Sequence, residues 1–285
     1  MHLPDCLHLA GTPAYPICEV RHPCATARIA VNGAHLMEWT PAGEQPVLYL
    51  SPEAVLESGK PIRGGIPVCW PWFGPHADPR RPMHGYARIL PWRLAKADAD
   101  TAGVHLVFEL EPGEAAGPWW EPRLAARLEM RIGMELDVVL ATRNIGDEPL
   151  LLEEALHTYL TVGDIHRVRV SGLEGAAYLD TVGERVMRRQ VGDIAFAGEV
   201  DRQYASFAAV AIADPALGRT LVVEKEGSAT TVVWNPWIEK SKRLADLPDE
   251  AYLGFLCVEA ANAGDGAVDL APGMEHHLRT RVRLA

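Results

Sequence analysis

The chain has 285 residues, 48% of them hydrophobic, which is the ordinary composition of a soluble globular protein whose core needs no metal or disulfide. Its 38 acidic and 27 basic side chains give a formal net charge of −11, which argues against nucleic acids and anionic membrane surfaces as partners. No stretch approaches the roughly 20 apolar residues of a membrane helix, and none near the N-terminus is long enough for a signal peptide.

The first 60 residues contain one strong hairpin signal. Residues 1–25 are weakly patterned and are interpreted as a lead-in segment with room for one strand. Two alternating apolar runs, 27–31 and 34–40, flank an Asn-Gly dipeptide, which is typical of tight β-hairpins. Between residues 51 and 60, Ser51 followed by proline predicts the start of a short helix with the serine as its cap.

A segment rich in glycine and proline lies between residues 62 and 93. It cannot hold a regular helix or strand, because proline removes backbone donors and glycine favours positive φ. Loops of this length either carry function or are disordered, and the Trp and Phe content of this one argues against disorder. It is interpreted as an aromatic-plugged structural loop or as a rigid cradle that presents Arg63 and Arg88 to an anion.

The rest of the chain predicts short strands separated by Gly, Pro and Asp turns. Residues 150–160 have few breaks, which is typical of a buried central strand, and residues 111–122 are expected to form a second aromatic loop. Residues 240–250 are interpreted as a brief charged helix or an exposed loop. Many short strands and almost no amphipathic helix predict an all-β sandwich or barrel. No linker or composition shift divides residues 1–285, so we expect a single domain.

One strand candidate carries polar side chains that are suited to chemistry. If residues 153–159 are extended, the alternate residues from Glu153 to Tyr159, including His157, share one face. A His and a Tyr on a mostly apolar strand indicate a face turned toward a ligand. The alternative is a core histidine whose ring is satisfied by a backbone carbonyl.

A second apolar strand candidate, residues 255–260, contains the carboxylate of Glu259. A carboxylate in such a strand is rarely fully buried without a partner. The alternative is a glutamate at the end of the strand that points to solvent. Burial would raise the pKa of this group, and a cationic neighbour would lower it.

The glycine-rich segment contains two ordered motifs. Residues 63–74 read Arg-Gly-Gly-Ile-Pro-Val-Cys-Trp-Pro-Trp-Phe-Gly, and residues 84–88 read His-Gly-Tyr-Ala-Arg. Four shorter motifs follow: Leu-His-Thr-Tyr at 156–159, Asp-Arg-Gln-Tyr at 201–204, Trp-Asn-Pro-Trp at 234–237 and Cys-Val-Glu at 257–259. With these motifs the chain resembles the hexose-6-phosphate mutarotases, which are glucose-6-phosphate 1-epimerases within the aldose 1-epimerase (galactose mutarotase-like) group.

The resemblance implies a large antiparallel β-sandwich and an enzyme that interconverts the α and β anomers of a hexose 6-phosphate. It implies that His157 is the catalytic acid and Glu259 the catalytic base, and that Arg63, Arg88 and Asp201 bind the substrate. Mutarotation needs a base at the anomeric hydroxyl and an acid at the ring oxygen. It requires no redox cofactor, metal or covalent nucleophile, so we expect no cofactor.

One position departs from the family pattern. Met83 stands where some family members have a substrate-contacting Gln, and a methionine cannot donate a hydrogen bond, which leaves the fine sugar specificity open. The neighbouring His84 is expected to line the sugar site as a hydrogen-bond donor, or instead to brace the loop. Residues 234–237 are expected to wall the site or to pack in the core.

The expected partner is a small hexose 6-phosphate, with no nucleic acid, membrane or metal, and the protein is expected to be a monomer. Five cysteines with no Cys-x-x-Cys spacing argue against a disulfide framework or a thiolate zinc site, which favours a reducing cytoplasm. Two alternatives remain open: a mutarotase for free aldoses, and a non-catalytic carbohydrate-binding protein on the same scaffold.

Overall fold

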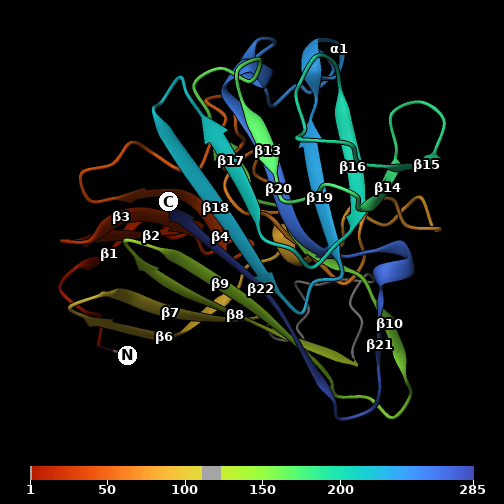
Figure 1. The fold of residues 1–285 in the computed structure, drawn as a ribbon. Helices are drawn as coiled ribbons and strands as arrows, with labels where there is room; N and C mark the ends of the chain where they lie inside the picture. Colours follow the sequence, from red (N-terminus) through yellow and green to blue (C-terminus); the bar gives the residue numbers. More distant parts are fainter. Residues whose placement is uncertain (1, 111–122) are drawn as a thin grey trace.

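The computed structural model describes residues 2–110 and 123–285, and strands dominate it (Figure 1). Two eight-stranded sheets, a four-stranded sheet and a two-stranded sheet are built from strands that pair antiparallel with their neighbours. The predicted all-β fold, a large antiparallel sandwich with few short helices, is therefore confirmed. The aromatic loop predicted at 111–122 lies outside the described residues.

The first eight-stranded sheet is organised around β20 (Phe255–Asn262). In spatial order its strands are β15 (Val186–Arg189), β14 (Ala177–Asp180), β16 (Val200–Ala205), β19 (Thr230–Asn235), β20, β11 (Glu154–Leu156) and β5 (Val68–Cys69), and β12 (Tyr159–Thr161) also pairs with β20. Every residue of β19 and β20 is buried, because both faces of these central strands are covered.

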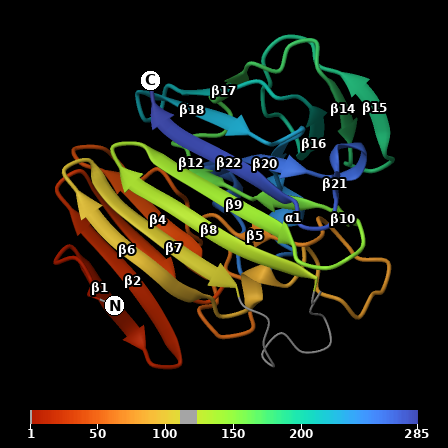
Figure 2. The ribbon, with the colours of Figure 1, turned by 90° about the horizontal axis from the view of Figure 1, so that it is seen from below.

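The second eight-stranded sheet packs against the first. Its order is β13 (Arg169–Ser171), β17 (Val210–Asp214), β18 (Arg219–Glu226), β22 (Glu275–Leu284), β9 (Leu136–Asn144), β8 (Leu124–Gly133), β7 (Gly103–Leu110) and β6 (Arg93–Asp100). Buried and more exposed residues alternate along most of β8 and β22, so one face of this sheet faces the core and the other faces solvent. The contact between the sheets runs through β20 and β22 (Figure 2).

The four-stranded sheet corrects the expectation for the N-terminus. Its strands are β1 (Leu7–Thr12), β2 (Tyr15–His22), β3 (Ala25–Ala30) and β4 (His35–Pro41), so residues 1–25 supply two strands rather than a loose lead-in. The weak pattern conceals buried Leu7, Cys18 and Val20, which join the main core. The hairpin predicted around the Asn-Gly dipeptide is confirmed by the pairing of β3 with β4. The small two-stranded sheet joins β10 (Leu150–Leu152) to β21 (Val268–Leu270).

Helical structure is sparse. The described residues contain the short helix α1 (Trp237–Ser241) and the 3₁₀ turns η1 (Ala87–Ile89), η3 (Ala251–Gly254) and η4 (Gly264–Gly266). The helix predicted after Ser51 is wrong: the Ser51 hydroxyl and carbonyl accept the amides of Glu53 and Ala54, but only one turn forms before an irregular segment. None of the helices described here has the length and apolar character needed to cross a membrane.

Two hydrophobic clusters lie on opposite faces of β20. Leu256, Val258 and Ala260 join the main core between the sheets. Phe255 and Cys257, together with Ala261, belong to a smaller aromatic cluster on the other face. Because side chains alternate along a strand, Glu259 projects toward the smaller cluster. This second cluster forms the floor on which the candidate site is built.

The strand predicted at 150–160 is interrupted, and the interruption carries His157. The residues form β10, β11 and β12 instead of one strand. The Thr158 amide turns back to the Leu156 carbonyl (2.9 Å), while the His157 amide donates to the Pro67 carbonyl (3.1 Å) of the glycine-rich loop. The prediction of one continuous strand is wrong for this reason, although Leu156 and Tyr159 keep their register with β20.

Candidate active site

Two glycines after Arg63 let the glycine-rich loop lie directly against other segments of backbone. Gly64 and Gly65 have φ values of +111° and +61°. A Cβ atom on Gly64 would lie 2.4 Å from the Tyr49 carbonyl oxygen, and one on Gly65 would lie 2.2 Å from the Leu36 carbonyl oxygen. Only glycine fits such close approaches at positive φ, so this pair of residues fixes where Arg63 leaves the loop.

The Gly65→Ala substitution is expected to lower the free energy of unfolding by about 3 kcal/mol or more, because it combines left-handed strain with a backbone clash. Gly43 is the matched control, since it has φ +78° and a Cβ added there would meet no atom within 4 Å. The Gly43→Ala variant should lose only about 1 to 2 kcal/mol. Urea denaturation measures both, and equal losses would contradict the packing argument.

All six predicted site residues line one cavity of about 370 Å³ over the smaller cluster. They come from distant parts of the chain: Arg63, His84 and Arg88 from the glycine-rich loop, His157 from the break after β11, Asp201 from β16 and Glu259 from β20. The cavity wall also includes Tyr159 and Trp234, whose rings pack against that of His157. The fold thus brings together side chains that the sequence separates by up to 196 positions.

The imidazole of His157 and the carboxylate of Glu259 are neighbours. His157 Nε2 lies 3.3 Å from Glu259 Oε1, and the two side chains are 12% and 1% exposed. His157 Nδ1 and Glu259 Oε2 are buried and have no hydrogen-bond partner among the described residues. The solvent-facing alternative for Glu259 is wrong, because this residue sits in the middle of a strand whose two faces are covered.

Burial controls the protonation of this pair. It lowers the pKa of His157 well below its usual value, and the nearby charges of His84, Arg88 and Arg63 lower it further. Burial raises the pKa of Glu259 well above its usual value, Asp201 raises it further, and Arg88 opposes the shift. These shifts place the titrating proton on the carboxyl group and leave the imidazole neutral.

The Glu259→Gln variant is expected to be more thermostable than the wild type at neutral pH. Because the folded-state pKa of Glu259 is raised, this carboxyl contributes stability below the ordinary glutamate pKa, and the contribution is lost as the pH rises toward the folded-state value. The glutamine variant escapes that loss, so its advantage in Tm should grow between pH 4 and pH 8, as measured by calorimetry.

A matched control for this titration is Glu174→Gln, which changes an exposed carboxylate in a surface turn. Its Tm should stay close to that of the wild type across the same range, because substitution of an exposed side chain changes stability little. An advantage of Glu259→Gln that shrinks as the pH rises would show that the buried carboxylate is stabilising when ionised, which would contradict a raised pKa.

His84 is held in one tautomer. Its Nδ1 atom accepts a hydrogen bond from the Gly74 amide (3.1 Å), so the proton of the neutral ring lies on Nε2. Burial, with Arg88 and Arg63, lowers the pKa of His84 to about 3, so the ring is neutral at physiological pH. His84 therefore braces the loop through Nδ1 and also lines the cavity, and its role as a hydrogen-bond donor to a sugar stays a prediction.

The two arginines of the loop motifs are anchored differently. Arg63 Nε donates to Asp246 Oδ1 (3.1 Å), and Arg63 Nη1 donates to the Tyr159 hydroxyl (3.1 Å). Arg88 Nη2 donates to the Met83 carbonyl (2.7 Å), and its buried Nε has no hydrogen-bond partner among the described residues. The interpretation of this segment as a purely structural loop is therefore incomplete, because both arginines line the cavity.

Lys240 and Asp246 are among the charged residues of the cavity wall that sequence reasoning missed. Lys240 Nζ lies 3.3 Å from Asp201 Oδ2 and 2.9 Å from Glu199 Oε1, and Asp246 pairs with Arg63. The segment that holds them was expected to be an exposed charged helix or loop. The sequence signal that could have placed this segment at the cavity is its position shortly after the Trp-Asn-Pro-Trp motif at residues 234–237.

Trp234 walls the cavity and also packs in the smaller cluster, so the two readings of that motif are both correct for this residue. Met83 lines the cavity as well, with its side chain 55% exposed. Its backbone carbonyl, rather than its side chain, makes the hydrogen bond to Arg88. The thioether can contact a ligand only through apolar surface.

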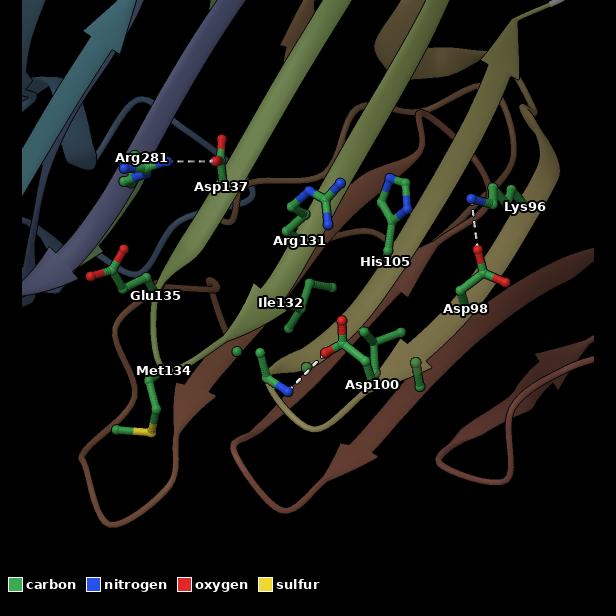
Figure 3. A pocket seen from close by; sticks show the side chains of 15 residues that line it. Lys96, Asp98, Asp100, His105, Arg131, Ile132, Met134, Glu135, Asp137 and Arg281 are labelled. Atoms are coloured by element: carbon green, nitrogen blue, oxygen red, sulfur yellow. Dashed lines mark hydrogen bonds and ion pairs between the residues drawn. The ribbon is translucent and has the colours of Figure 1, made fainter.

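A second hollow, of about 690 Å³, lies across β6, β7, β8 and β9 (Figure 3). It contains none of the predicted site residues, and several of its charges are paired with each other, including Arg281 with Asp137 and Lys96 with Asp98. Although this hollow is larger, the smaller cavity holds the buried acid–base pair. Among the described residues, no group of three or more His, Cys, Asp and Glu side chains is placed to hold a metal ion.

The sequence profile of the family described as "Aldose 1-epimerase" matches residues 16–283. A protein of Escherichia coli K12 described as "Putative glucose-6-phosphate 1-epimerase" is 37% identical over 268 residues, which cover 93% of this chain and 89% of the relative. A protein of Cenchrus ciliaris with the same description is also 37% identical, over 91% of this chain and 80% of the relative.

Solved structures show the same architecture. A crystal structure from Salmonella typhimurium, described as that of a "putative mutarotase", superposes with a TM-score of 0.93 and 34% identity and covers all of this chain and 95% of the other. A protein of Synechocystis superposes with a TM-score of 0.74 at 20% identity, over 98% and 95% of the two chains. The second likeness concerns the fold alone.

Proposed function

The chain belongs to the aldose 1-epimerase family, and from this premise we propose that it interconverts the α and β anomers of a hexose 6-phosphate, with glucose 6-phosphate as the expected substrate. The observation that carries the proposal is the 3.3 Å approach of His157 Nε2 to Glu259 Oε1 within a cavity lined by Arg63 and Arg88. The curated relatives described as glucose-6-phosphate 1-epimerases support the choice of substrate.

The proton cycle uses one proton shared by the pair. In the ring-opening form, Glu259 is a carboxylate that takes the proton of the anomeric hydroxyl, while the His157 imidazolium protonates the ring oxygen. The bond between C1 and the ring oxygen breaks, and C1 becomes an aldehyde. The pair is left as carboxylic acid and neutral imidazole, which are the protonation states that burial favours.

Reclosure reverses these transfers after rotation about the C1–C2 bond. The hydroxyl that was the ring oxygen attacks the other face of the aldehyde and returns its proton to His157, while Glu259 returns a proton to the anomeric oxygen. The pair ends with the same protons with which it began. The two forms of the pair, carboxylate with imidazolium and acid with imidazole, contain equal numbers of protons, so no outside acid or base is needed.

A phosphate group suits the cationic side of the cavity. Arg63 and Arg88 present guanidinium donors, and a phosphate monoester has about −1.5 to −2 charges near neutral pH. The same two arginines help to lower the pKa of His157. A bound dianion offsets their charge and therefore favours the imidazolium that opens the ring.

Two further side chains are assigned to the sugar. His84 offers its Nε2 proton to an oxygen of the substrate, because its Nδ1 atom is already occupied by the Gly74 amide. Asp201 accepts a hydrogen bond from a sugar hydroxyl through the carboxylate oxygen that Lys240 does not hold. Both assignments leave the phosphate to the guanidinium groups of Arg63 and Arg88, which line the same cavity.

The direct test is exchange NMR between the anomers of glucose 6-phosphate. The wild-type protein should accelerate exchange above the spontaneous rate in proportion to its concentration, and free glucose should be a much poorer substrate. Equal acceleration for the two sugars would favour a mutarotase for free aldoses. Tight binding in calorimetry without acceleration would favour a non-catalytic carbohydrate-binding protein and would refute the proposal.

A further inference from the structure

Two charged residues, Lys240 in α1 and Asp246 in the segment that follows it, line the cavity without belonging to any motif described above. We infer that Asp246 is a positioning residue for Arg63, and that Lys240 is a positioning residue for Asp201. Each pairs with some of the polar atoms of a substrate-binding side chain of opposite charge. The remaining polar atoms of that side chain are left to bind the sugar phosphate. The inference rests on the proposed function.

The guanidinium group of Arg63 is fixed along one edge. Asp246 Oδ1 accepts from Nε at 3.1 Å, the Tyr159 hydroxyl accepts from Nη1 at 3.1 Å, and Nη2 has no hydrogen-bond partner among the described residues. The Arg63 and Asp246 side chains are only 22% and 23% exposed. Asp246 is itself tied down, because its backbone carbonyl accepts a hydrogen bond from the Ser51 hydroxyl (2.7 Å). A planar fork held in this way is already oriented for an anion.

Asp201 is held in the corresponding way by an opposite charge. Lys240 Nζ lies 3.3 Å from Asp201 Oδ2, while Oδ1 has no hydrogen-bond partner among the described residues. The ammonium group also binds Glu199 Oε1 at 2.9 Å and lies 5.8 Å from the centroid of the Trp234 ring. Lys240 thus keeps two carboxylates from repelling each other at the rim of a cavity that receives an anion.

A competing account makes Asp246 a rival of the substrate. A carboxylate beside Arg63 reduces the positive potential that attracts phosphate, so its removal could tighten binding. Positioning and rivalry predict opposite changes in KM for the same substitution. The contrast makes Asp246 the sharper of the two tests, because its neutral isostere changes little else in the cavity.

The Asp246→Asn variant should raise KM for glucose 6-phosphate about tenfold with a smaller change in kcat, since one charged hydrogen bond that orients Arg63 is weakened. Turnover of free glucose should change less than about twofold, because it has no phosphate to meet Arg63. Asp246→Glu keeps the negative charge, so its KM for glucose 6-phosphate should lie between those of the wild type and Asp246→Asn. If the asparagine variant does not fold, KM is compared for the two sugars on the glutamate variant instead. Asp137→Asn is the matched control, since it weakens a similar pair with Arg279 on the other sheet.

The Lys240→Met variant should lower kcat/KM about tenfold for phosphorylated and free sugars alike, because Asp201 meets the sugar itself. The uncompensated Asp201 charge should also move the acidic limb of the pH–rate profile to higher pH, since that charge already raises the pKa of Glu259 after burial. Lys240→Arg should restore activity, and Lys242→Met, which removes an exposed lysine of the same segment, should be neutral.

An unchanged or lower KM for Asp246→Asn, or an equal loss on both sugars, would overturn the assignment of Asp246. Unchanged kinetics and an unshifted pH profile for Lys240→Met would overturn that of Lys240. If the wild type accelerates neither sugar, the proposed function fails and the inference fails with it. If the wild type is active and both variants behave like it, the inference alone is refuted.

Discussion

Replacing His157 by alanine and Glu259 by glutamine together is expected to abolish the accelerated exchange between the anomers of glucose 6-phosphate. General acid–base catalysis contributes about 10²- to 10⁴-fold per positioned group. The two groups share one proton cycle across 3.3 Å, so the double variant should lose little more than either single variant. Exchange NMR at equal protein concentrations measures the residual rate.

The matched control is a second His–Glu pair in the same molecule. His105 Nε2 lies 3.5 Å from Glu129 Oε2 on β7 and β8, beside the hollow of Figure 3. The corresponding double substitution, His105→Ala with Glu129→Gln, removes the same types of side chain and should leave exchange unchanged. Exchange by the His157→Ala/Glu259→Gln variant at the wild-type rate would show that the chemistry occurs elsewhere.

Reversing the charge of Arg63 is expected to separate phosphorylated from free sugars. Arg63→Glu replaces a guanidinium donor by a carboxylate, and like charges placed against a phosphate cost several kcal/mol, which corresponds to a loss in kcat/KM of about 100-fold or more. Turnover of free glucose should remain near that of the wild type. Because the kcat/KM values for both sugars are measured on the same preparation of one variant, their ratio does not depend on how much of that protein is active.

Arg131→Glu provides the charge-matched control, because Arg131 is an exposed guanidinium on β8 in the other sheet. It changes the net charge of the protein by the same amount and should affect neither sugar. Arg63→Glu also places a carboxylate beside Asp246, so the Tm of this variant is measured in parallel. Arg63→Met repeats the comparison of the two sugars without the repulsion between carboxylates. Equal losses on both sugars for both variants would argue against a phosphate role.

The arrangement of strands was predictable where local patterns are strong. The Asn-Gly dipeptide and its flanking alternation correctly placed β3 and β4, because turn geometry and hydrophobic period are local properties. Only one strand was allowed for where β1 and β2 form, since their stability comes from pairing along the sheet with β3 and from scattered buried residues. The same limit explains the helix predicted after Ser51, where a capping residue is present but no apolar helical stripe follows.

The pairing of His157 with Glu259 illustrates what residue patterns alone leave open. Because side chains alternate along an extended strand, the sequence predicted that His157 and Tyr159 share one face. Their rings stack at a centroid distance of 4.8 Å. No local pattern indicates that β11 and β12 both pair with β20, which is what carries the imidazole to the carboxylate. The resemblance to a family supplied that step, because it encodes tertiary contacts that spacing does not.

Lys240 and Asp246 were not predicted for the same physical reason. A charged segment of sequence usually lies in solvent. The ion pairs of Lys240 with Asp201 and of Asp246 with Arg63 connect residues 39 and 183 positions apart. The domain assignment and the roles of the individual site residues remain predictions. The roles depend on how a substrate lies in the cavity.

A crystal of the wild-type protein soaked with glucose 6-phosphate tests the central claim most directly. We expect the ring oxygen within hydrogen-bond distance of His157, the anomeric hydroxyl within hydrogen-bond distance of Glu259, and the phosphate against Arg63 and Arg88. A sugar bound with its phosphate at the His157–Glu259 pair, or with its anomeric carbon outside the cavity, would contradict the claim.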